Sequence, residues 1–388
     1  MTRLCIHNVR AVLPDRVLDD AVVVAEDGVL VDVAERAGPP PPAAVDGRGA
    51  YLLPGLVDTH SDGLEKELQP RPGVEFDVGF GLASFEGRVR AAGITTVFHA
   101  TGYYGDDSKN RSIEGALVRE RAIRTRMCDG QAQLDHRMLF RLDARDPDGL
   151  AALGETLEYY RAETVPPLVS YEDHTPGQGQ FRDLDAYARL YLGEHDRTTA
   201  HQLMAARIAE RDGRVWHREV ALDWLVHRNG TVRVLGHDPV TADEVADLAA
   251  VGVAVAEFPT TLAAAHAARE YGLLVVAGAP NVLRGGSHSG NVAAADLIAE
   301  GLVDGLSSDY MPFSMIGAAF RLARDGRAPL PVAVGLVTRG AARVAGLADR
   351  GRLEVGARAD LVLVTEDAGW PTVRSTWSAV DDRVLVGS

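Results

Sequence analysis

The 388-residue chain has little cysteine and no long apolar segment. Cys5 and Cys128 are its two cysteines, so a disulfide framework is excluded, and this pattern is typical of a reducing compartment. No apolar run reaches the roughly 20 residues that a membrane helix needs. The first residues also lack the charged region, apolar stretch and cleavage site of a signal peptide. We therefore expect a cytoplasmic protein without a membrane partner.

Positive charge is also scarce. The formal net charge is −15, which argues against nucleic acid as a partner because phosphate backbones attract basic surfaces. Lys66 and Lys109 are the only lysines among the 40 basic residues. A local group of arginines can still bind a small anion. Hydrophobic residues make up 46% of the chain, enough for a large domain with a smaller one beside it.

The middle of the chain alternates short apolar runs with helical patterns, which indicates repeated βα units. We predict eight strands, ending near these residues: His60, Ala100, Asp143, His174, His237, Pro259, Asn281 and Asp309. Eight such units in roughly 250 residues are typical of a TIM-like (β/α)₈ barrel. The sequence therefore predicts an α/β fold.

Both ends of the chain read as short strands separated by turn signals. We expect residues 1–51 and 351–388 to pair into one small β-sandwich domain. Residues 52–350 would form the barrel, with a mostly helical insertion at about 180–230 near its mouth.

Polar side chains follow five of the predicted strands. His60 and Asp62 are two residues apart, so both point to the same face of their strand. Four further apolar runs also end at an acid or a histidine: Asp143, His174, His237 and Asp309. A single His or Asp at a strand end is usually a structural residue or a helix cap. Five together, on strand ends that converge at one face of a barrel, indicate a metal site.

Three imidazoles and three carboxylates suit a divalent cation. We expect Zn²⁺, with Mn²⁺ as the alternative, and one or two ions. Neither lysine lies at a predicted strand end, so a lysine-derived bridge between two ions is not expected, and Asp143 is our candidate for that position. Asp309 is the candidate catalytic residue, a base that takes a proton from the attacking water.

A glycine-rich segment, residues 278–291, follows the seventh predicted strand. Such a segment is usually an ordinary strand-to-helix loop. Here it also carries Arg284, and its glycines let backbone N–H groups approach an anion near the start of the next helix. We predict a phosphate-binding rim made by these side chains: Arg284, Ser287, His288, Arg71, Arg141 and Lys66.

Two stretches, residues 52–60 and 351–363, resemble the opening and closing motifs of the amidohydrolase superfamily. Over nearly its full length the chain resembles the α-D-ribose 1-methylphosphonate 5-triphosphate diphosphatase family of the carbon–phosphorus lyase pathway. Residues 173–181, 284–293 and 306–310 carry most of this resemblance.

The resemblance implies a metal-dependent hydrolase of phosphonate metabolism. Water would attack the α-phosphorus of a ribose 5-triphosphate, releasing pyrophosphate and leaving the 5-phosphate. The partner would be a small phosphorylated sugar, and a homodimer remains open. The resemblance places these residues at metal or catalytic positions: His60, Asp62, His174, His237 and Asp309.

The chain departs from the family pattern at His99, Asp143, Glu172 and Pro239. His99 closes the second predicted strand and is a candidate to add or displace a polar contact in the pocket. These departures bear on the substrate more than on the fold.

Two other functions remain open. The same metal site could hydrolyse a C–N bond, as in a deaminase or cyclic-amide hydrolase. The chain could also be a metal-stabilised binding protein without activity. The arginine-bearing loop discriminates against the first alternative, since an uncharged amide needs no cationic rim.

Overall fold

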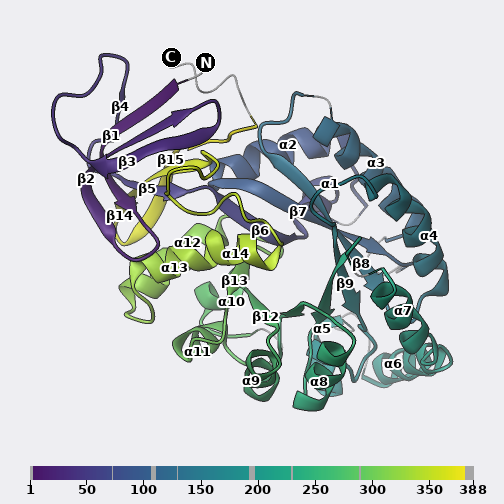
Figure 1. The fold of residues 1–388 in the computed structure, drawn as a ribbon. Helices are drawn as coiled ribbons and strands as arrows, with labels where there is room; N and C mark the ends of the chain where they lie inside the picture. The colour runs from purple at the N-terminus through teal and green to yellow at the C-terminus, as the bar shows by residue number, and fades with distance from the viewer. Residues whose placement is uncertain are drawn as a thin grey trace.

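A computed structural model describes residues 3–71, 73–105, 111–128, 130–191, 197–228, 230–287 and 290–380. The chain forms a parallel barrel with a strand-rich sheet beside it, as the sequence predicts (Figure 1). Among the described residues, none of the helices has both the length and the apolar character that a membrane span requires.

Eight parallel strands form the barrel, and each pairs with the next one along the chain. They are β6 (Leu56–Ser61), β7 (Ile94–Tyr103), β8 (Asp135–Asp143), β9 (Leu168–Glu172), β10 (Arg233–His237), β11 (Val255–Glu257), β12 (Leu274–Gly278) and β13 (Gly305–Ser307). Their inward side chains form an apolar cluster that includes Phe98, Leu139, Leu235 and Val276. Strands buried on both faces read as continuous apolar runs, which is why the sequence pattern located them.

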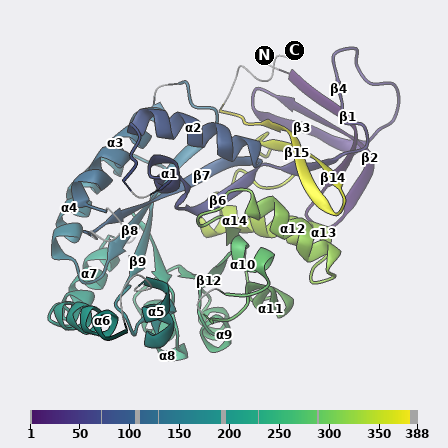
Figure 2. The same ribbon diagram turned by 180° about the vertical axis from the view of Figure 1, so that it is seen from behind.

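Helices cover the outside of the barrel (Figures 1 and 2). They are α1 (Gly63–Leu68), α2 (Val78–Ala91), α3 (Ile113–Cys128), α4 (Pro147–Leu157), α5 (Leu184–Tyr191), α6 (Arg197–Asp212), α7 (His217–Val226), α8 (Ala242–Ala250), α9 (Leu262–Glu270), α10 (Ala279–Arg284), α11 (Ala294–Ala299), α12 (Ser314–Arg324), α13 (Leu330–Val337) and α14 (Arg339–Val344), with short 3₁₀ turns η2 (Glu158–Tyr160) and η3 (Gly179–Phe181). In the described part of the connection between β9 and β10 lie η3 and the helices α5, α6 and α7.

The two ends of the chain meet in one seven-stranded sheet. Its strands are β1 (Arg3–Val12), β2 (Val17–Glu26), β3 (Val29–Glu35), β4 (Val45–Asp46), β5 (Tyr51–Pro54), β14 (Leu361–Asp367) and β15 (Trp370–Trp377). The order β15-β14-β5-β1-β2-β3, with β4 on β1, places the C-terminal strands directly against β5. In both views the purple N-terminal strands and the yellow C-terminal strands lie side by side (Figures 1 and 2).

The barrel closes where β6 meets the end of β13. Ser61 and Asp309 form a single parallel bridge, and the amide of Asp309 donates to the carbonyl of His60 at 2.9 Å. Deeper in the seam, the buried carboxylate of Asp58 accepts from the amide of Ser308 at 2.9 Å and from its hydroxyl at 2.5 Å. Burial raises the pKa of Asp58 to about 6, although the bonds from Ser308 favour its ionised form. The hydrogen bonds between Asp58 and Ser308 therefore join the first barrel strand, β6, to the end of the last, β13.

Replacing Ser308 with alanine should therefore weaken the closed barrel. The variant removes a hydroxyl donor from a buried carboxylate, and the expected loss in apparent free energy of unfolding is about 1.5–3 kcal/mol. Urea unfolding followed by tryptophan fluorescence measures it. Ser307→Ala is the matched control, because its buried hydroxyl has no hydrogen-bond partner among the described residues. Equal losses in the two variants would contradict this role for Ser308.

Candidate active site

A pocket of about 550 Å³ opens at the carboxyl ends of the barrel strands. Active sites of such barrels lie at this face, because the loops that follow the strands converge there. The strand ends supply both acids and imidazoles to its floor: His60, Asp62, His174, His237, Asp238 and Asp309. These side chains come from segments far apart in the sequence.

Three of the strand ends share one backbone turn. Asp238, Phe258 and Asp309 follow β10, β11 and β13 directly or after one residue, and each has a φ near +54°. Aspartate tolerates this left-handed conformation, but for a bulky residue such as phenylalanine it is an outlier. Strained backbone of this kind clusters at functional sites. In this chain the turn recurs where side chains enter the pocket.

Glu257 holds two of the imidazoles in place. Its Oε1 lies 2.8 Å from Nδ1 of His60, and its Oε2 lies 2.7 Å from Nδ1 of His237. The hydroxyl of Ser170 also donates to Oε2 at 2.5 Å. A carboxylate bonded to Nδ1 favours the tautomer in which Nδ1 carries the proton and Nε2 has a free lone pair. Burial opposes the charge of Glu257, but the two imidazoles hold its pKa below the ordinary value.

Arg141 lies between two acids of the site. Its Nη1 contacts both oxygens of Asp62, at 2.9 and 3.1 Å, and its Nε donates to Oε1 of Glu172 at 2.7 Å. The guanidinium is nearly buried and lines the pocket. It therefore supplies one fixed positive charge to a floor rich in carboxylates.

Three sets of side chains bring ligand atoms close enough to hold a cation, with all atoms of a set within 4.8 Å of one another. The sets are His60, His237 and Glu257; Glu172, His174 and His237; and His60, Asp62 and Asp309. Because Glu257 is already bonded to two Nδ1 atoms, the second and third sets are the better candidates.

Two buried carboxylate oxygens in this floor accept no hydrogen bond from any described residue. They are Oε2 of Glu172 and Oδ2 of Asp238. A buried anionic oxygen without a donor is costly, so the arrangement fits a cation better than an apo pocket. Burial and the nearby Asp62 raise the pKa of Asp309 to about 6, close to that of a base that works near neutrality.

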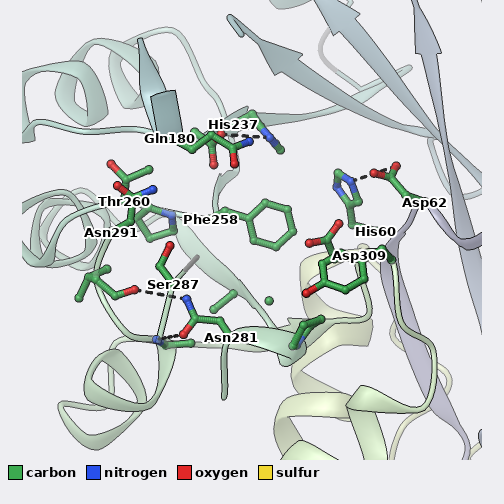
Figure 3. Close-up of a pocket in the computed structure, with 18 of the residues that line it drawn as sticks. His60, Asp62, Gln180, His237, Phe258, Thr260, Asn281, Ser287, Asn291 and Asp309 are labelled. Carbon is green, nitrogen blue, oxygen red and sulfur yellow. Dashed lines mark hydrogen bonds and ion pairs between the residues drawn. The ribbon is translucent and has the colours of Figure 1, made fainter. Parts of the chain in front are cut away.

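The opposite wall of the pocket is uncharged or basic. Figure 3 shows the ring of Phe258 between His60 and Asp309 on one side and Thr260, Asn281, Ser287 and Asn291 on the other. Asn281 anchors the glycine-rich segment, since its Oδ1 accepts from the amide of Ala294 at 2.9 Å. Lys66 and Arg284 also line the pocket, and neither has an ion-pair partner within the described part of the chain.

Comparison with known proteins shows the family to which the chain belongs. Residues 174–371 match the model of the amidohydrolase family. The chain is also 37% identical, over 366 residues, to α-D-ribose 1-methylphosphonate 5-triphosphate diphosphatase of Escherichia coli (strain K12), which covers 93% of this chain and 94% of that protein. The chain belongs to the amidohydrolase family, and within it to the family of that diphosphatase.

Solved structures share the fold at much lower identity. A Xaa-Pro dipeptidase with bound methionine superposes with a TM-score of 0.64 at 14% identity, covering 97% of this chain and 98% of that one. A dihydropyrimidinase from Brevibacillus agri NCHU1002 gives a TM-score of 0.56 at 15% identity, with 97% and 94% covered. These likenesses concern the barrel and its companion sheet.

The structure brings together five side chains that the sequence nominated as ligands: His60, Asp62, His174, His237 and Asp309. Of the predicted rim, Lys66, Arg141, Arg284 and Ser287 line the pocket. Arg71 is exposed and is not among the lining residues. His288 lies outside the described residues.

Asp143 requires a correction. Its two carboxylate oxygens are 2.8 and 2.7 Å from Nη1 and Nη2 of Arg211, and it is in none of the three candidate ligand sets. Asp143 is the last residue of β8, so it lies beyond Arg141 and meets helix α6 at the rim of the barrel. Glu172, at the end of the neighbouring strand, is instead a member of one of the three sets.

His99 is also placed differently from the expectation that it alters the pocket. Its neighbours on β7, Phe98 and Ala100, face the barrel interior, so His99 faces the helices. It packs against Phe85 of α2, and its Nε2 lies 2.8 Å from Nδ1 of His136. His136 in turn contacts Glu86 at 3.0 Å. This chain of buried polar groups belongs to the barrel wall.

Sequence reasoning assigned no site role to four residues of this region: Glu172, Asp238, Glu257 and Arg111. Glu257 closes an apolar strand just as His60 and His237 do, and Glu172 lies two residues after Ser170 on the inward face of β9. The same strand-end signal could have found both. Arg111 lies just before helix α3, and no periodic pattern points to it.

The buried state of His99 predicts a pH effect. Burial and the neighbouring His136 keep the pKa of His99 well below its ordinary value. In the unfolded chain His99 binds a proton that it does not bind in the folded chain. The free energy of unfolding therefore keeps its full contribution from His99 above pH 6.5 and decreases as the pH falls below this value. In His99→Asn the free energy of unfolding should therefore fall less steeply below pH 6.5, by roughly 1.4 kcal/mol for each pH unit.

Urea midpoints measured between pH 7.5 and 5.5 test this difference. His227→Asn, at an exposed position, is the control and should keep the wild-type slope. Parallel slopes for His99→Asn and wild type would refute the assignment.

Proposed function

We propose that the chain hydrolyses α-D-ribose 1-methylphosphonate 5-triphosphate, or a close analogue, to the 5-phosphate and pyrophosphate in phosphonate metabolism. The observation that carries the proposal is the 37% identity, over 93% of the chain, to the Escherichia coli enzyme of that name. The pocket supports it, because an acidic chain presents there two cations, Lys66 and Arg284, without carboxylate partners among the described residues. A small phosphorylated sugar in the cytoplasm is the proposed substrate.

Catalysis in this proposal requires a divalent ion, and Zn²⁺ is the ion we propose, with Mn²⁺ as the alternative. One ion would be held by His60, Asp62 and Asp309, and a second, if bound, by Glu172, His174 and His237. Such an ion supplies Lewis acidity, which lowers the pKa of water and neutralises charge on phosphoryl oxygens. Oε2 of buried Glu172 accepts no hydrogen bond from the described residues and lies 3.5 Å from Nδ1 of His174, which supports this donor set.

In the proposed reaction, a water oxygen bonds to the α-phosphorus, and the bond from that phosphorus to the α,β-bridging oxygen breaks, so that this oxygen leaves with pyrophosphate. Asp309 takes the proton of the water, a role that suits a buried carboxylate with a pKa of about 6. Lys66 and Arg284 would neutralise the charge that develops on the departing pyrophosphate. Arg141, already fixed by Asp62 and Glu172, would face the α-phosphoryl oxygens from the floor.

Hydrolysis of a C–N bond is the alternative, since the same ion can serve both reactions. The two cations of the pocket favour the triphosphate. A neutral cyclic amide would leave them without a counter-charge.

Isotope labelling tests the proposed reaction. Purified protein loaded with Zn²⁺ or Mn²⁺ should release pyrophosphate from ribose 5-triphosphates and from nucleoside triphosphates. In H₂¹⁸O the label should enter the 5-phosphate, because water attacks the α-phosphorus. Removing the metal with a chelator should abolish release, and adding it back should restore it. Orthophosphate as the product, or label in the pyrophosphate, would contradict the proposal.

Arg284→Met tests the cationic rim. Loss of one charge-assisted contact to a phosphate should raise KM roughly tenfold, the equivalent of about 1.4 kcal/mol, with a smaller change in kcat. Steady-state pyrophosphate release measures both constants. Arg327→Met, at a half-exposed arginine outside the pocket, is the control. If both variants keep the wild-type KM, Arg284 does not contact the substrate.

A further inference from the structure

His174 differs from the other imidazoles of the site because it is not on a strand. Strand β9 ends at Glu172, so His174 lies in the loop that follows. Its two neighbours in sequence are joined to each other: Oδ1 of Asp173 accepts from the amide of Thr175 at 3.1 Å and from its hydroxyl at 2.6 Å. The orientation of His174 therefore depends on what holds Asp173 and Thr175.

One guanidinium reaches both of these neighbours. Arg211, near the end of α6, donates from Nε to the hydroxyl of Thr175 at 2.6 Å, and its Nη2 lies 3.4 Å from Oδ1 of Asp173. The same side chain binds both oxygens of Asp143 at 2.8 and 2.7 Å. Arg211 thus connects helix α6 to the end of β8 and to the residues on either side of His174.

Two further arginines contact Asp173, and Nε of one of them, Arg218, lies 3.4 Å from its Oδ2. Arg145 donates from Nε to Asp173 at 2.9 Å and from Nη1 to Asp212 at 3.0 Å. Asp143 and Arg145 are buried, whereas Asp212 is exposed, so all of these charges except that of Asp212 are largely shielded from water. Buried ion pairs add little net stability but strongly favour one geometry, because any other leaves a charge unpaired. The network therefore favours a single position for the loop.

The same loop forms part of the pocket wall. The amide of Gln178 donates to the carbonyl of Thr175 at 2.9 Å, and the chain then enters η3, where Gln180 and Phe181 line the pocket. The ring of Phe181 lies edge-on to that of His174, with centroids 5.8 Å apart. A displacement of Thr175 would therefore move a candidate ligand and the wall together.

We propose that Arg211 is a positioning residue: through Asp173 and Thr175 it orients His174 for the metal ion and sets the wall that contacts the substrate. The role of His174 as a ligand rests on the function proposed above. The helices between β9 and β10 thereby contribute to metal affinity without supplying a ligand. Asp143 serves as the anchor of Arg211.

Metal affinity is the first readout, measured by competition between the protein and a chromophoric chelator for Zn²⁺. Arg211→Met should weaken binding by tenfold to a hundredfold, the usual effect of removing a group that orients a ligand. Arg211→Lys should recover part of this loss, and guanidinium added to Arg211→Met should recover part of it as well. Arg214→Met is the control, since Arg214 is half-exposed on the next turn and pairs with Glu210 on the surface.

Thr175→Val is the second variant, because it keeps the shape of the side chain and removes the hydroxyl that accepts from Arg211 and donates to Asp173. It should weaken Zn²⁺ binding in the same direction and raise the KM for the triphosphate, while thermal unfolding stays close to wild type. Wild-type Zn²⁺ affinity in both Arg211→Met and Thr175→Val would overturn the proposal. The proposal would also be overturned if the loss of Zn²⁺ affinity merely matched the fraction of variant protein that is unfolded and guanidinium did not restore it.

The two proposals fail separately. If wild-type protein released no pyrophosphate from any triphosphate, the proposed reaction would fall, but the Zn²⁺ affinities of these variants would still decide the role of Arg211.

Discussion

The carboxylate of Glu257 bridges two imidazoles from opposite sides of the barrel mouth, and the rest of the site depends on this bridge. By accepting from Nδ1 of both His60 and His237, it directs both Nε2 atoms toward the pocket. A buried charge is tolerated only when its oxygens are satisfied, and here two imidazoles and Ser170 satisfy them. The acids and imidazoles of the floor are arranged around this fixed pair.

Barrel closure brings the first and last strands of that floor together. The bridge between Ser61 and Asp309 and the buried pair of Asp58 and Ser308 place His60 and Asp62 next to Asp309. In an open sheet these residues would lie at opposite edges. The candidate base and two candidate ligands are therefore neighbours because the barrel is closed.

Arginine side chains offset the repulsion between the many neighbouring carboxylates at this site. Arg141 pairs with Asp62 and Glu172 inside the floor, while Arg211 pairs with Asp143 and Asp173 at its edge. A planar guanidinium binds two oxygens at once, so it fixes geometry as well as charge. Lys66 and Arg284, which have no such partners among the described residues, line the other part of the pocket.

Sequence alone determined the number and order of the barrel strands, because strands buried on both faces are continuous apolar runs. It also determined five of the ligand candidates, since His60, Asp62, His174, His237 and Asp309 interrupt such runs at their ends. Only tertiary structure decided that Asp143 meets Arg211, that His99 faces a helix and that Glu257 bridges two imidazoles. Alternation along a strand shows which residues share a face, but which face turns inward, and which distant helix packs against a strand end, is set by contacts between segments far apart in the chain.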